Sequence, residues 1–274
     1  MEIVYIILLL IFFLVLILTT PDDDQIVMAN DYDYFNRFSD KSMRKLINNN
    51  RLNEPIVKKN KILFITYDNR VNEDYVLIHN NNILKYCKKY DYRYKFFNKC
   101  NDNTYWCKMF MVLHELKKNK YDYVIWLDSD TVIKNFDIDI GDIFNKYSSD
   151  IFIGSDNNSS RDITNAGVFI IKNSEDGINF LMDCIEHISS KCLNDDGTLK
   201  GIWAASCYEQ GVMNILIHDK YSKNTTILTN EIIFNYNICS DEVFIMHLYA
   251  SPSNYRVRCF NSNNPALIMN NENK

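Results

Sequence analysis

Apolar and polar positions alternate in a regular way through the middle of the chain. Short apolar runs bounded by polar residues predict buried strands, and apolar residues spaced three and four apart predict helices. The expected strands are Ile62–Tyr67, Tyr92–Phe97, Tyr123–Leu127, Ile151–Ile153, Val168–Ile171 and Val243–Met246, and the expected helices are Tyr75–Tyr90, Trp106–Leu116, Ile178–Ile188 and Glu209–Ile217. Strands that alternate with helices at this spacing are typical of an α/β fold with a mostly parallel sheet.

Several of the expected strands carry few polar side chains on either face. Tyr123–Leu127 has no charged residue and is apolar at successive positions. A strand of this kind needs apolar neighbours on both sides, so we expect helices to cover both faces of the sheet. With 274 residues, 47% of them hydrophobic, the chain can bury a sizeable core. We therefore expect a single folded domain over residues 60–260.

The N-terminal segment is strongly apolar. Ile3–Thr20 contains no charged residue, and its Leu, Ile, Phe and Val residues together favour the bilayer by on the order of several kcal/mol. Its length is close to the lower limit for a spanning helix. We expect residues 1–20 to form a transmembrane anchor, with a cleaved signal peptide as the alternative. The acidic start, Met1-Glu2, and the lack of a small-residue cleavage motif before Pro21 favour the anchor.

Polar sequence follows this anchor and also ends the chain. Residues 21–59 are expected to form a stem, and the Asn-rich residues 261–274 a flexible tail. Neither flank of the anchor is basic, so charge gives little information on its orientation. We expect a single-pass, type II membrane protein whose folded domain lies in the lumen of the Golgi or ER, or at an equivalent host or viral membrane.

The cysteines agree with a lumenal location. The chain has eight of them and no C-x-x-C pair, so their spacing matches no zinc site. An even number of cysteines in a lumenal domain permits disulfides. Closeness in the sequence makes Cys100 with Cys107, and Cys239 with Cys259, the candidate pairs. Free buried thiols are the alternative interpretation.

Charge and glycine content exclude several classes of function. The net charge of -5 and the absence of a basic stripe argue against a nucleic-acid partner. With only 7 glycines, the chain has no Walker-type or G-x-G-x-x-G phosphate loop, which argues against kinases, NTPases and Rossmann dehydrogenases. A small anionic ligand remains compatible with the charge if a metal ion neutralises it. The sequence carries no signal for the oligomeric state.

Acidic residues follow two of the expected strands, where ligands bind in open α/β sheets. Asp68 ends the first strand, and Asp128-Ser129-Asp130 follows Tyr123–Leu127. In an extended chain, the i, i+2 spacing would point both carboxylates of the second group the same way. Two adjacent carboxylates need a counter-charge, and a divalent cation supplies it. The alternative for this group is a solvated acidic turn or a helix N-cap before Val132.

A histidine follows the last expected strand. His247 comes directly after Val243–Met246 and could complete a metal site with two carboxylates. A hydrogen-bonded structural histidine is the alternative, and it is the more common role of a lone histidine.

Four short motifs together resemble the nucleotide-sugar glycosyltransferases of the GT-A fold. They are Ile125-Trp126-Leu127-Asp128-Ser129-Asp130, Asn165-Ala166-Gly167 with the apolar run after it, Glu209-Gln210 followed by Asn214, and Met246-His247-Leu248. Their order and spacing agree with that group over roughly Lys61 to Arg258. The tyrosine-rich segment Asn80–Tyr92 resembles glycosyltransferase family 34 in particular, a galactosyl-, xylosyl- and mannosyltransferase group. The resemblance implies a GT-A (Rossmann-like) sheet flanked by helices.

The resemblance also implies roles for individual residues. Asp128, Asp130 and His247 would hold Mn²⁺ (or Mg²⁺), and the ion would bridge the diphosphate of a UDP- or GDP-sugar. Gln210 and Glu209 would face the reacting sugar as the catalytic pair. The remaining contacts to the donor would come from Asp68, Lys108, Ser129, Asn165, Gly167 and Arg256. Gly167 would let the backbone approach the sugar closely.

The implied reaction is the transfer of a hexosyl or pentosyl residue to a glycan or glycoprotein acceptor, with retention of configuration. Gln210 suits a same-face attack that needs no strong nucleophile, whereas a covalent route would use Glu209. The chain departs from the family in having Glu209 where Asp is usual. The basic residue that usually follows the histidine would have to be Arg256 or Arg258. A family 8-like glycosyltransferase and a non-catalytic protein that binds glycans or nucleotides are the alternatives.

Overall fold

The computed structural model describes residues 60–261, apart from 101, 157–163 and 203–204. The predicted anchor and stem lie outside these residues, as does the predicted tail apart from Asn261, which ends a helix instead. Among the helices that the structure describes, none combines the length and the apolar character needed to cross a membrane.

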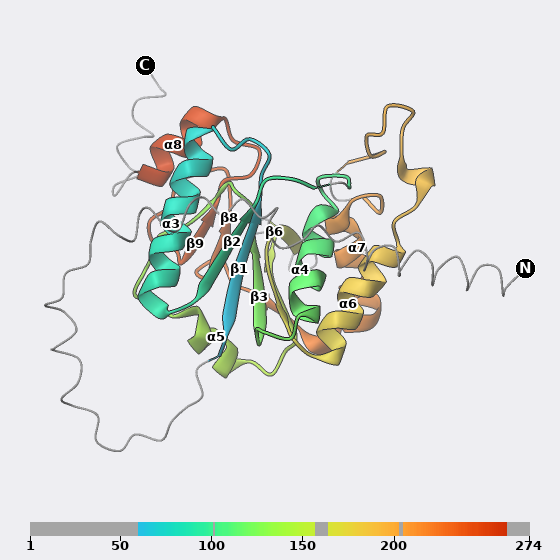
Figure 1. The fold of residues 1–274 in the computed structure, drawn as a ribbon, viewed down its shortest axis with the longest axis horizontal. Coiled ribbons are helices and arrows are strands. Elements are labelled where there is room, and N and C mark those ends of the chain that lie inside the picture. Colours follow the sequence, from blue (N-terminus) through green and yellow to red (C-terminus); the bar gives the residue numbers. More distant parts are fainter. Residues whose placement is uncertain (1–59, 101, 157–163, 203–204, 262–274) are drawn as a thin grey trace, which may run out of the picture. The chain divides into compact units, whose positions relative to one another are not determined.

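A six-stranded sheet forms the centre of the described domain (Figure 1). Its strands are β1 (Ile62–Tyr67), β2 (Arg93–Phe97), β3 (Tyr123–Leu127), β5 (Ile151–Ser155), β6 (Thr164–Lys172) and β7 (Thr225–Leu228). They are arranged in the order β2-β1-β3-β6-β5-β7. The strand β6 runs antiparallel to its neighbours β3 and β5, and the other pairings are parallel. The expected mostly parallel sheet is thus confirmed, with one reversed strand at its middle.

Helices pack on both faces of this sheet (Figure 1). They are α3 (Asp74–Tyr90), α4 (Cys107–Lys117), α5 (Ile140–Lys146), α6 (Glu175–Glu186), α7 (Glu209–Leu216), which continues into a π-helical turn (Ile217–Tyr221), and α8 (Ser253–Asn261). Short 3₁₀ turns occupy Ser190–Cys192 and Ser222–Asn224. Helices α3 and α8 lie on one side, and α4, α6 and α7 lie on the other.

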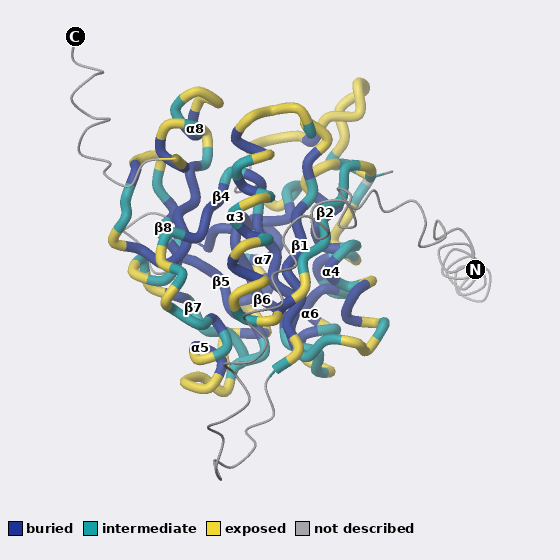
Figure 2. Tube along the Cα trace, turned by 60° about the vertical axis from the view of Figure 1, so that its left-hand side comes forward, coloured by how far each residue is buried: buried dark blue, intermediate teal, exposed yellow. Residues whose placement is uncertain are grey.

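The central strand β3 shows why both faces had to be covered. Val124 and Trp126 pack in the apolar cluster that includes side chains of α4, α6 and α7. Ile125 and Leu127 point the other way, into a cluster with Ile83 of α3 and side chains of α5. All five residues of β3 are buried. In Figure 2, the middle of the described domain is mostly dark blue, and exposed yellow segments lie toward its outside. The alternation of side chains along a strand therefore divides β3 between two cores.

Capping residues mark the ends of several helices. The Ser174 side chain accepts a hydrogen bond from the Gly177 backbone N–H and caps α6. The Asp139 side chain accepts one from the Gly141 backbone N–H and caps α5 in the same way. At the other end of α3, Asp91 adopts a left-handed conformation with φ of 58°, which ends the helix and turns the chain into β2.

A second, three-stranded sheet lies beside the first. It consists of β4 (Thr131–Ile133), β9 (Ile245–His247) and β8 (Ile233–Asn235), in that order. Within it, His247 is paired in register with both Thr131 and Asn235. This corrects two sequence-based interpretations. His247 is the last residue of its strand rather than the residue after it, and the segment after Asp130 enters a strand rather than a helix.

Three disulfides connect segments of the described domain. Cys100–Cys107 and Cys239–Cys259 confirm the two pairs suggested by sequence proximity. Cys192–Cys207 is a third bond, whose cysteines are 15 residues apart. Cys87 and Cys184 are buried free thiols. Both sequence-based interpretations of the cysteines thus apply, to different residues.

Candidate active site

The two acidic residues of the D-x-D motif lie in a turn between the two sheets. The Thr131 backbone N–H donates to the Asp128 carbonyl oxygen over 3.1 Å, and the Thr131 hydroxyl donates to the same oxygen over 2.8 Å. The extended conformation expected from the i, i+2 spacing is therefore wrong. The physical reason is topological, since β3 belongs to the large sheet and β4 to the small one. The chain has to change direction between them.

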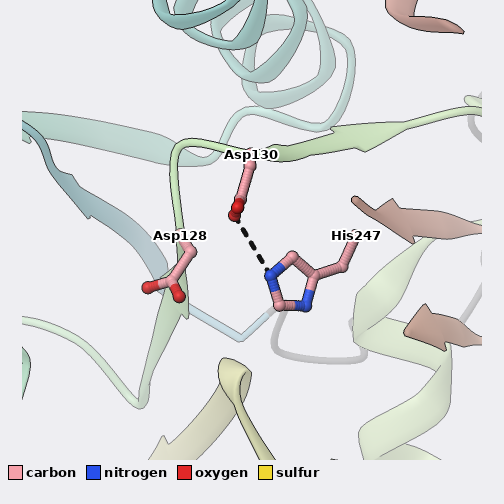
Figure 3. A group of neighbouring side chains, drawn as sticks. All are labelled: Asp128, Asp130 and His247. Carbon is pink, nitrogen blue, oxygen red and sulfur yellow. Dashed lines mark ion pairs between the residues drawn. The ribbon is translucent and has the colours of Figure 1, made fainter. Parts of the chain in front are cut away.

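The turn nevertheless brings both carboxylates close to one histidine. One possible ligand atom from each of Asp128, Asp130 and His247 lies within 4.8 Å of the other two. Figure 3 shows the Asp130 carboxylate and the His247 ring facing each other, with the ion-pair distance from Oδ1 to Nε2 at 3.1 Å. Two carboxylates and one imidazole nitrogen are suitable ligands for Mn²⁺ and related divalent cations. The predicted metal ligands are thus gathered in one place.

The hydrogen bonds around His247 determine which of its ring nitrogens carries a proton. The Asn235 amide nitrogen donates to the Ser155 carbonyl oxygen over 2.9 Å, which turns the amide oxygen Oδ1 toward the histidine. His247 Nδ1 lies 2.7 Å from that oxygen and therefore acts as the donor. In the neutral imidazole, Nε2 is then the nitrogen with a lone pair.

His247 Nε2 is buried and has no hydrogen-bond partner among the residues that the structure describes. Its 3.1 Å approach to Asp130 meets the distance of an ion pair but lacks the alignment of a hydrogen bond. A lone pair that faces a carboxylate oxygen is unfavourable unless a cation lies between them. A histidine oriented through its other nitrogen, with the free nitrogen beside carboxylates, is the usual arrangement of a metal ligand. The residues present therefore fit a divalent metal ion.

Two glycines make room for the histidine and the asparagine that orients it. A side chain at Gly167 of β6 would overlap the His247 ring, and one at Gly154 of β5 would collide with the Asn235 amide. Neither glycine has a left-handed backbone, so space rather than conformation demands glycine here. The sequence resemblance placed Gly167 against a sugar, and the structure places the His247 ring directly against it.

Asp130 is held from its other side by a buried arginine. Arg256 of α8 contacts Asp130 Oδ2 through Nη2 over 2.8 Å and donates from Nε to the Leu248 carbonyl oxygen over 3.2 Å. Burial by itself would raise the pKa of Asp130, and the positive charge of Arg256 opposes this shift. Asp130 is thus kept ionised, as a metal ligand must be. Arg256, expected at the donor phosphates, is engaged with this carboxylate.

Asp68 anchors the middle residue of the D-x-D turn. Its carboxylate accepts a short hydrogen bond from the Ser129 hydroxyl. Arg70 binds the same carboxylate through Nε at 2.9 Å and Nη2 at 2.8 Å. Burial would raise the pKa of Asp68, yet the bonds from Arg70 and Ser129 lower it overall. The predicted donor-side residues Asp68 and Ser129 are therefore in direct contact.

Lys108 connects the D-x-D turn to the start of α7. Its ammonium nitrogen lies 3.2 Å from Asp128 Oδ1, 2.9 Å from Glu209 Oε1 and 3.2 Å from the Ala166 carbonyl oxygen. Burial would lower the pKa of this lysine, but the two carboxylates raise it. Asp128 Oδ1 also accepts from the Trp126 indole N–H over 2.6 Å. Lys108, expected near the diphosphate or sugar, thus serves as a bridge between two acidic residues of the site.

The two residues predicted as the catalytic pair begin α7, and each is held by one atom only. Glu209 Oε1 contacts Lys108, and Gln210 Oε1 accepts from the Ala166 backbone N–H over 3.0 Å. Within the described part of the chain, Glu209 Oε2 and Gln210 Nε2 are buried without a hydrogen-bond partner. Burial raises the pKa of Glu209, and Lys108 opposes this shift. A carboxylate oxygen and an amide N–H are therefore left for a substrate.

Asn165 and a further acidic residue complete the site. Asn165 Oδ1 accepts from the Gly167 backbone N–H over 2.8 Å, and its Nδ2 donates to Asp156 Oδ1 over 3.3 Å. Asp156 follows β5 and is 8% exposed, and burial raises its pKa. Sequence reasoning missed Asp156, although it follows an expected strand just as Asp68 does. It also missed Asn235, for which the short strand β8 gave no signal.

Comparisons with known proteins identify the fold. No protein-family model and no curated protein matches the sequence. The structure is similar to the crystal structure of a glycosyltransferase involved in the glycosylation of the major capsid of PBCV-1. The TM-score is 0.56 at 12% identity, and the match covers 73% of this chain and 98% of that chain.

Two further solved structures are similar. One is the glycosyltransferase GlyE of Streptococcus pneumoniae TIGR4, with a TM-score of 0.44 at 13% identity, covering 78% of this chain and 63% of that chain. The other is A197 from STIV, with a TM-score of 0.37 at 15% identity, covering 62% of this chain and 82% of that chain. The likeness to the PBCV-1 protein and the sheet topology together show that the described domain has a GT-A-like glycosyltransferase fold.

Proposed function

We propose that this protein is a metal-dependent glycosyltransferase that transfers a hexosyl or pentosyl residue from a nucleotide-sugar to a glycan or glycoprotein. The observation that carries this proposal is the buried, unpartnered Nε2 of His247 beside the carboxylates of Asp128 and Asp130. A fold alone does not define a function, because many functions share one fold. Here two of the three candidate metal ligands, Asp128 and Asp130, lie beyond the end of β3, where open α/β sheets bind their ligands.

Asp128, Asp130 and His247 would hold Mn²⁺ or Mg²⁺. The ion would neutralise the diphosphate of a UDP- or GDP-sugar and act as a Lewis acid for the departing nucleotide. Asp68 and Ser129 form a fixed pair beside this centre, which suits a role in binding the nucleoside. Arg256 keeps Asp130 ionised and oriented, and its charge adds to the positive field that a diphosphate requires.

The residues that begin α7 would contact the transferred sugar and the acceptor in the proposed reaction, which retains the configuration. Gln210 is fixed through Oε1 and has an unpartnered amide N–H group, which can donate to the transferred sugar. Glu209 is fixed through Oε1 and has an unpartnered Oε2, which can accept a hydrogen bond from an acceptor hydroxyl. Because Lys108 engages both Glu209 and Asp128, the acceptor would approach next to the metal-bound donor.

We further propose a single-pass, type II membrane protein of the Golgi or ER, or of an equivalent viral or host membrane. The apolar run Ile3–Thr20 and the three disulfides of the described domain support this location, since disulfides persist in oxidising compartments.

The function can be tested with the full-length protein in a detergent without sugar head groups. Nucleotide release would be measured with Mn²⁺ and a panel of UDP- and GDP-sugars. We expect release from one donor, lost on addition of EDTA and in Asp130→Asn. The matched control is Asp137→Asn. Asp137 is exposed, and its carboxylate forms an ion pair with Lys89 on the surface of α3.

Metal-dependent nucleotide binding without release, in the presence of a broad set of glycan acceptors, would support the non-catalytic alternative. A folded protein that neither binds nor releases any nucleotide would refute the proposal.

A further inference from the structure

Two tyrosines flank the ion pair between Lys108 and Glu209. Tyr105 lies three residues before Lys108, just ahead of α4, and Tyr208 directly precedes Glu209 at the start of α7. Their rings meet edge to face with centroids 4.9 Å apart. Figure 1 shows the beginnings of α4 and α7 next to each other. The two rings therefore form one aromatic surface beside the catalytic pair.

This aromatic surface is open to solvent although it adjoins a buried charged centre. Tyr105 is 46% exposed, while the neighbouring Lys108 and Glu209 are 5% and 4% exposed. Burial of its hydroxyl and the negative charge of Glu209 contribute to raising the pKa of Tyr105, which places the phenol in the field of the catalytic carboxylate. A partly exposed tyrosine offers a ligand both an apolar ring face and a polar hydroxyl.

Covalent and hydrogen bonds hold both segments in place. Cys100–Cys107 closes the loop that contains Tyr105, and Cys192–Cys207 ends directly before Tyr208. The Trp106 indole N–H donates to the Cys207 carbonyl oxygen over 3.3 Å, which ties the two segments together. Because the rings are ordered before a ligand arrives, less conformational entropy is lost on binding.

The groups around the Tyr105 and Tyr208 rings indicate which class of ligand would bind there. The metal ligands lie on the Asp128 side of Lys108, and the tyrosines lie on its Glu209 side. The positive charge of Lys108 is already engaged by carboxylates, so this side offers little attraction for a phosphate. It offers aromatic rings, the Tyr105 hydroxyl and the unpartnered Glu209 Oε2, while the Tyr208 hydroxyl donates to the Leu199 carbonyl oxygen over 3.5 Å. A pyranose matches this set, because it has an apolar C–H face and a rim of hydroxyl groups.

We propose that Tyr105 and Tyr208 form the platform on which a pyranose ring of the acceptor glycan packs, with its reacting hydroxyl directed to Glu209. This inference rests on the proposed glycosyltransferase function and specifies the acceptor side of the same site.

Two separate readouts test this platform in the full-length protein. Binding of a panel of methyl gluco-, galacto-, manno- and xylopyranosides would be titrated by saturation-transfer NMR in the presence of Mn²⁺ and the nucleotide. Nucleotide release to water would be measured without any acceptor. The variants are Tyr105→Ala and Tyr105→Phe, and the matched control is Tyr147→Ala, which removes a tyrosine of similar exposure ahead of β5.

We expect at least one glycoside to bind the wild type and to lose about tenfold or more in affinity in Tyr105→Ala, an effect of losing roughly 1.4 kcal/mol. Tyr105→Phe should retain most of the affinity because it keeps the ring, and Tyr147→Ala should bind as the wild type does. Release of nucleotide to water should be the same in Tyr147→Ala as in the wild type, because the Tyr147 ring packs against Phe152 of β5.

Equal glycoside affinity in Tyr105→Ala and the wild type would overturn the platform while leaving the transferase function intact. The platform is equally refuted if no glycoside binds a wild-type protein that releases nucleotide. An absence of nucleotide release with every donor would instead count against the transferase function, and glycoside binding would still be judged by the titration. Melting temperatures would confirm that Tyr105→Ala is folded.

Discussion

Two buried histidines differ in one hydrogen bond, and this difference distinguishes a structural histidine from a candidate metal ligand. His79 of α3 and His247 of β9 are 0% and 2% exposed. His79 Nδ1 donates to the Thr131 carbonyl oxygen over 2.7 Å, and its Nε2 accepts from the Thr66 hydroxyl over 2.9 Å. His247 Nδ1 donates to Asn235 in the same way, but its Nε2 has no hydrogen-bond partner.

The complete set of partners explains His79 as a structural residue. It joins α3 to β1 and to the first residue of β4, and burial lowers its pKa to about 4, so it stays neutral at neutral pH. A buried polar atom without a partner carries a desolvation cost, and such an atom in a native site calls for an explanation. For His247, a metal ion held by Nε2 and the two carboxylates would provide that explanation. Substitutions at His247, Gly167, Asn235 and His79 test this contrast, in decreasing order of their expected effect on metal affinity.

Removal of the His247 ring should have the largest effect. In His247→Ala, we expect Mn²⁺-dependent nucleotide binding and release to be lost, because a ligand of the metal is missing. The loss should exceed the about 10–100-fold effect typical of residues that only orient a ligand. Isothermal titration with Mn²⁺ and the nucleotide-release assay would measure it. His187→Ala, which removes an exposed histidine from the end of α6, is the control. Unchanged Mn²⁺ affinity in His247→Ala would contradict the assignment.

A methyl group at Gly167 should have the next largest effect. It would overlap the His247 ring, so in Gly167→Ala the ring has to move away from the carboxylates. We expect a marked loss of metal affinity and a loss of about 1–3 kcal/mol in the free energy of unfolding from overpacking. Denaturant unfolding and Mn²⁺ titration would measure the two effects.

The double variant Gly167→Ala/His247→Ala sharpens this test. Without the ring, the added methyl group has space, so the double variant should regain much of the stability that Gly167→Ala loses. Additive destabilisation by the two substitutions would show that the methyl group strains something other than His247.

Loss of the orienting amide should have a smaller effect. In Asn235→Ala, Nδ1 of His247 loses its acceptor, and the ring is no longer held with Nε2 toward Asp130. We expect metal affinity to fall about 10–100-fold, in line with other partners of metal ligands. Mn²⁺ titration would check this, with the exposed Asn237→Ala as control. An affinity equal to that of the wild type would show that Asn235 does not orient the ligand.

His79 should affect stability and leave metal affinity unchanged. Its pKa is lowered from 6.5 to about 4 in the folded state, so the unfolded chain takes up the proton first as the pH falls. Its contribution to stability is therefore complete above about pH 6.5 and is lost as the pH falls toward 4. The loss is on the order of 3 kcal/mol.

The measurement for His79 is the free energy of unfolding between pH 7 and pH 4 in the wild type and in His79→Gln, by urea denaturation. The variant lacks this titrating group, so its stability should fall less steeply over that window. Parallel pH profiles for the two proteins would contradict the assignment, as would a loss of Mn²⁺ affinity in His79→Gln at neutral pH.

Much of the large sheet could be predicted because its strands coincide with apolar runs that are visible in the sequence. β1 and β3 have the expected bounds, since each is a compact apolar run that ends in an aspartate. Helix α3 and α7 also begin within a residue of expectation. In these segments, burial follows the order of apolar and polar residues along the chain, so it can be read directly from the sequence.

The small sheet could not be predicted in the same way. β4 and β8 are three residues long, too short for a period to be visible, and each exists because it pairs with β9. Asn235 and Gly154 have no local signature, because their roles depend on contacts across the two sheets. The orientations of the Lys108 and Arg256 side chains likewise depend on the carboxylates that lie next to them in the fold, Glu209 and Asp130.

The sequence by itself therefore determined the class of fold, the carboxylates of the D-x-D turn and the candidate catalytic pair, Glu209 and Gln210, because strand ends and motifs are local features. Only the tertiary structure decided that His247 presents a free Nε2 to Asp130, since this depends on an amide held by a carbonyl group from another sheet. The identity of a residue is local information, whereas the atoms left without a partner are known only when every neighbour is in place.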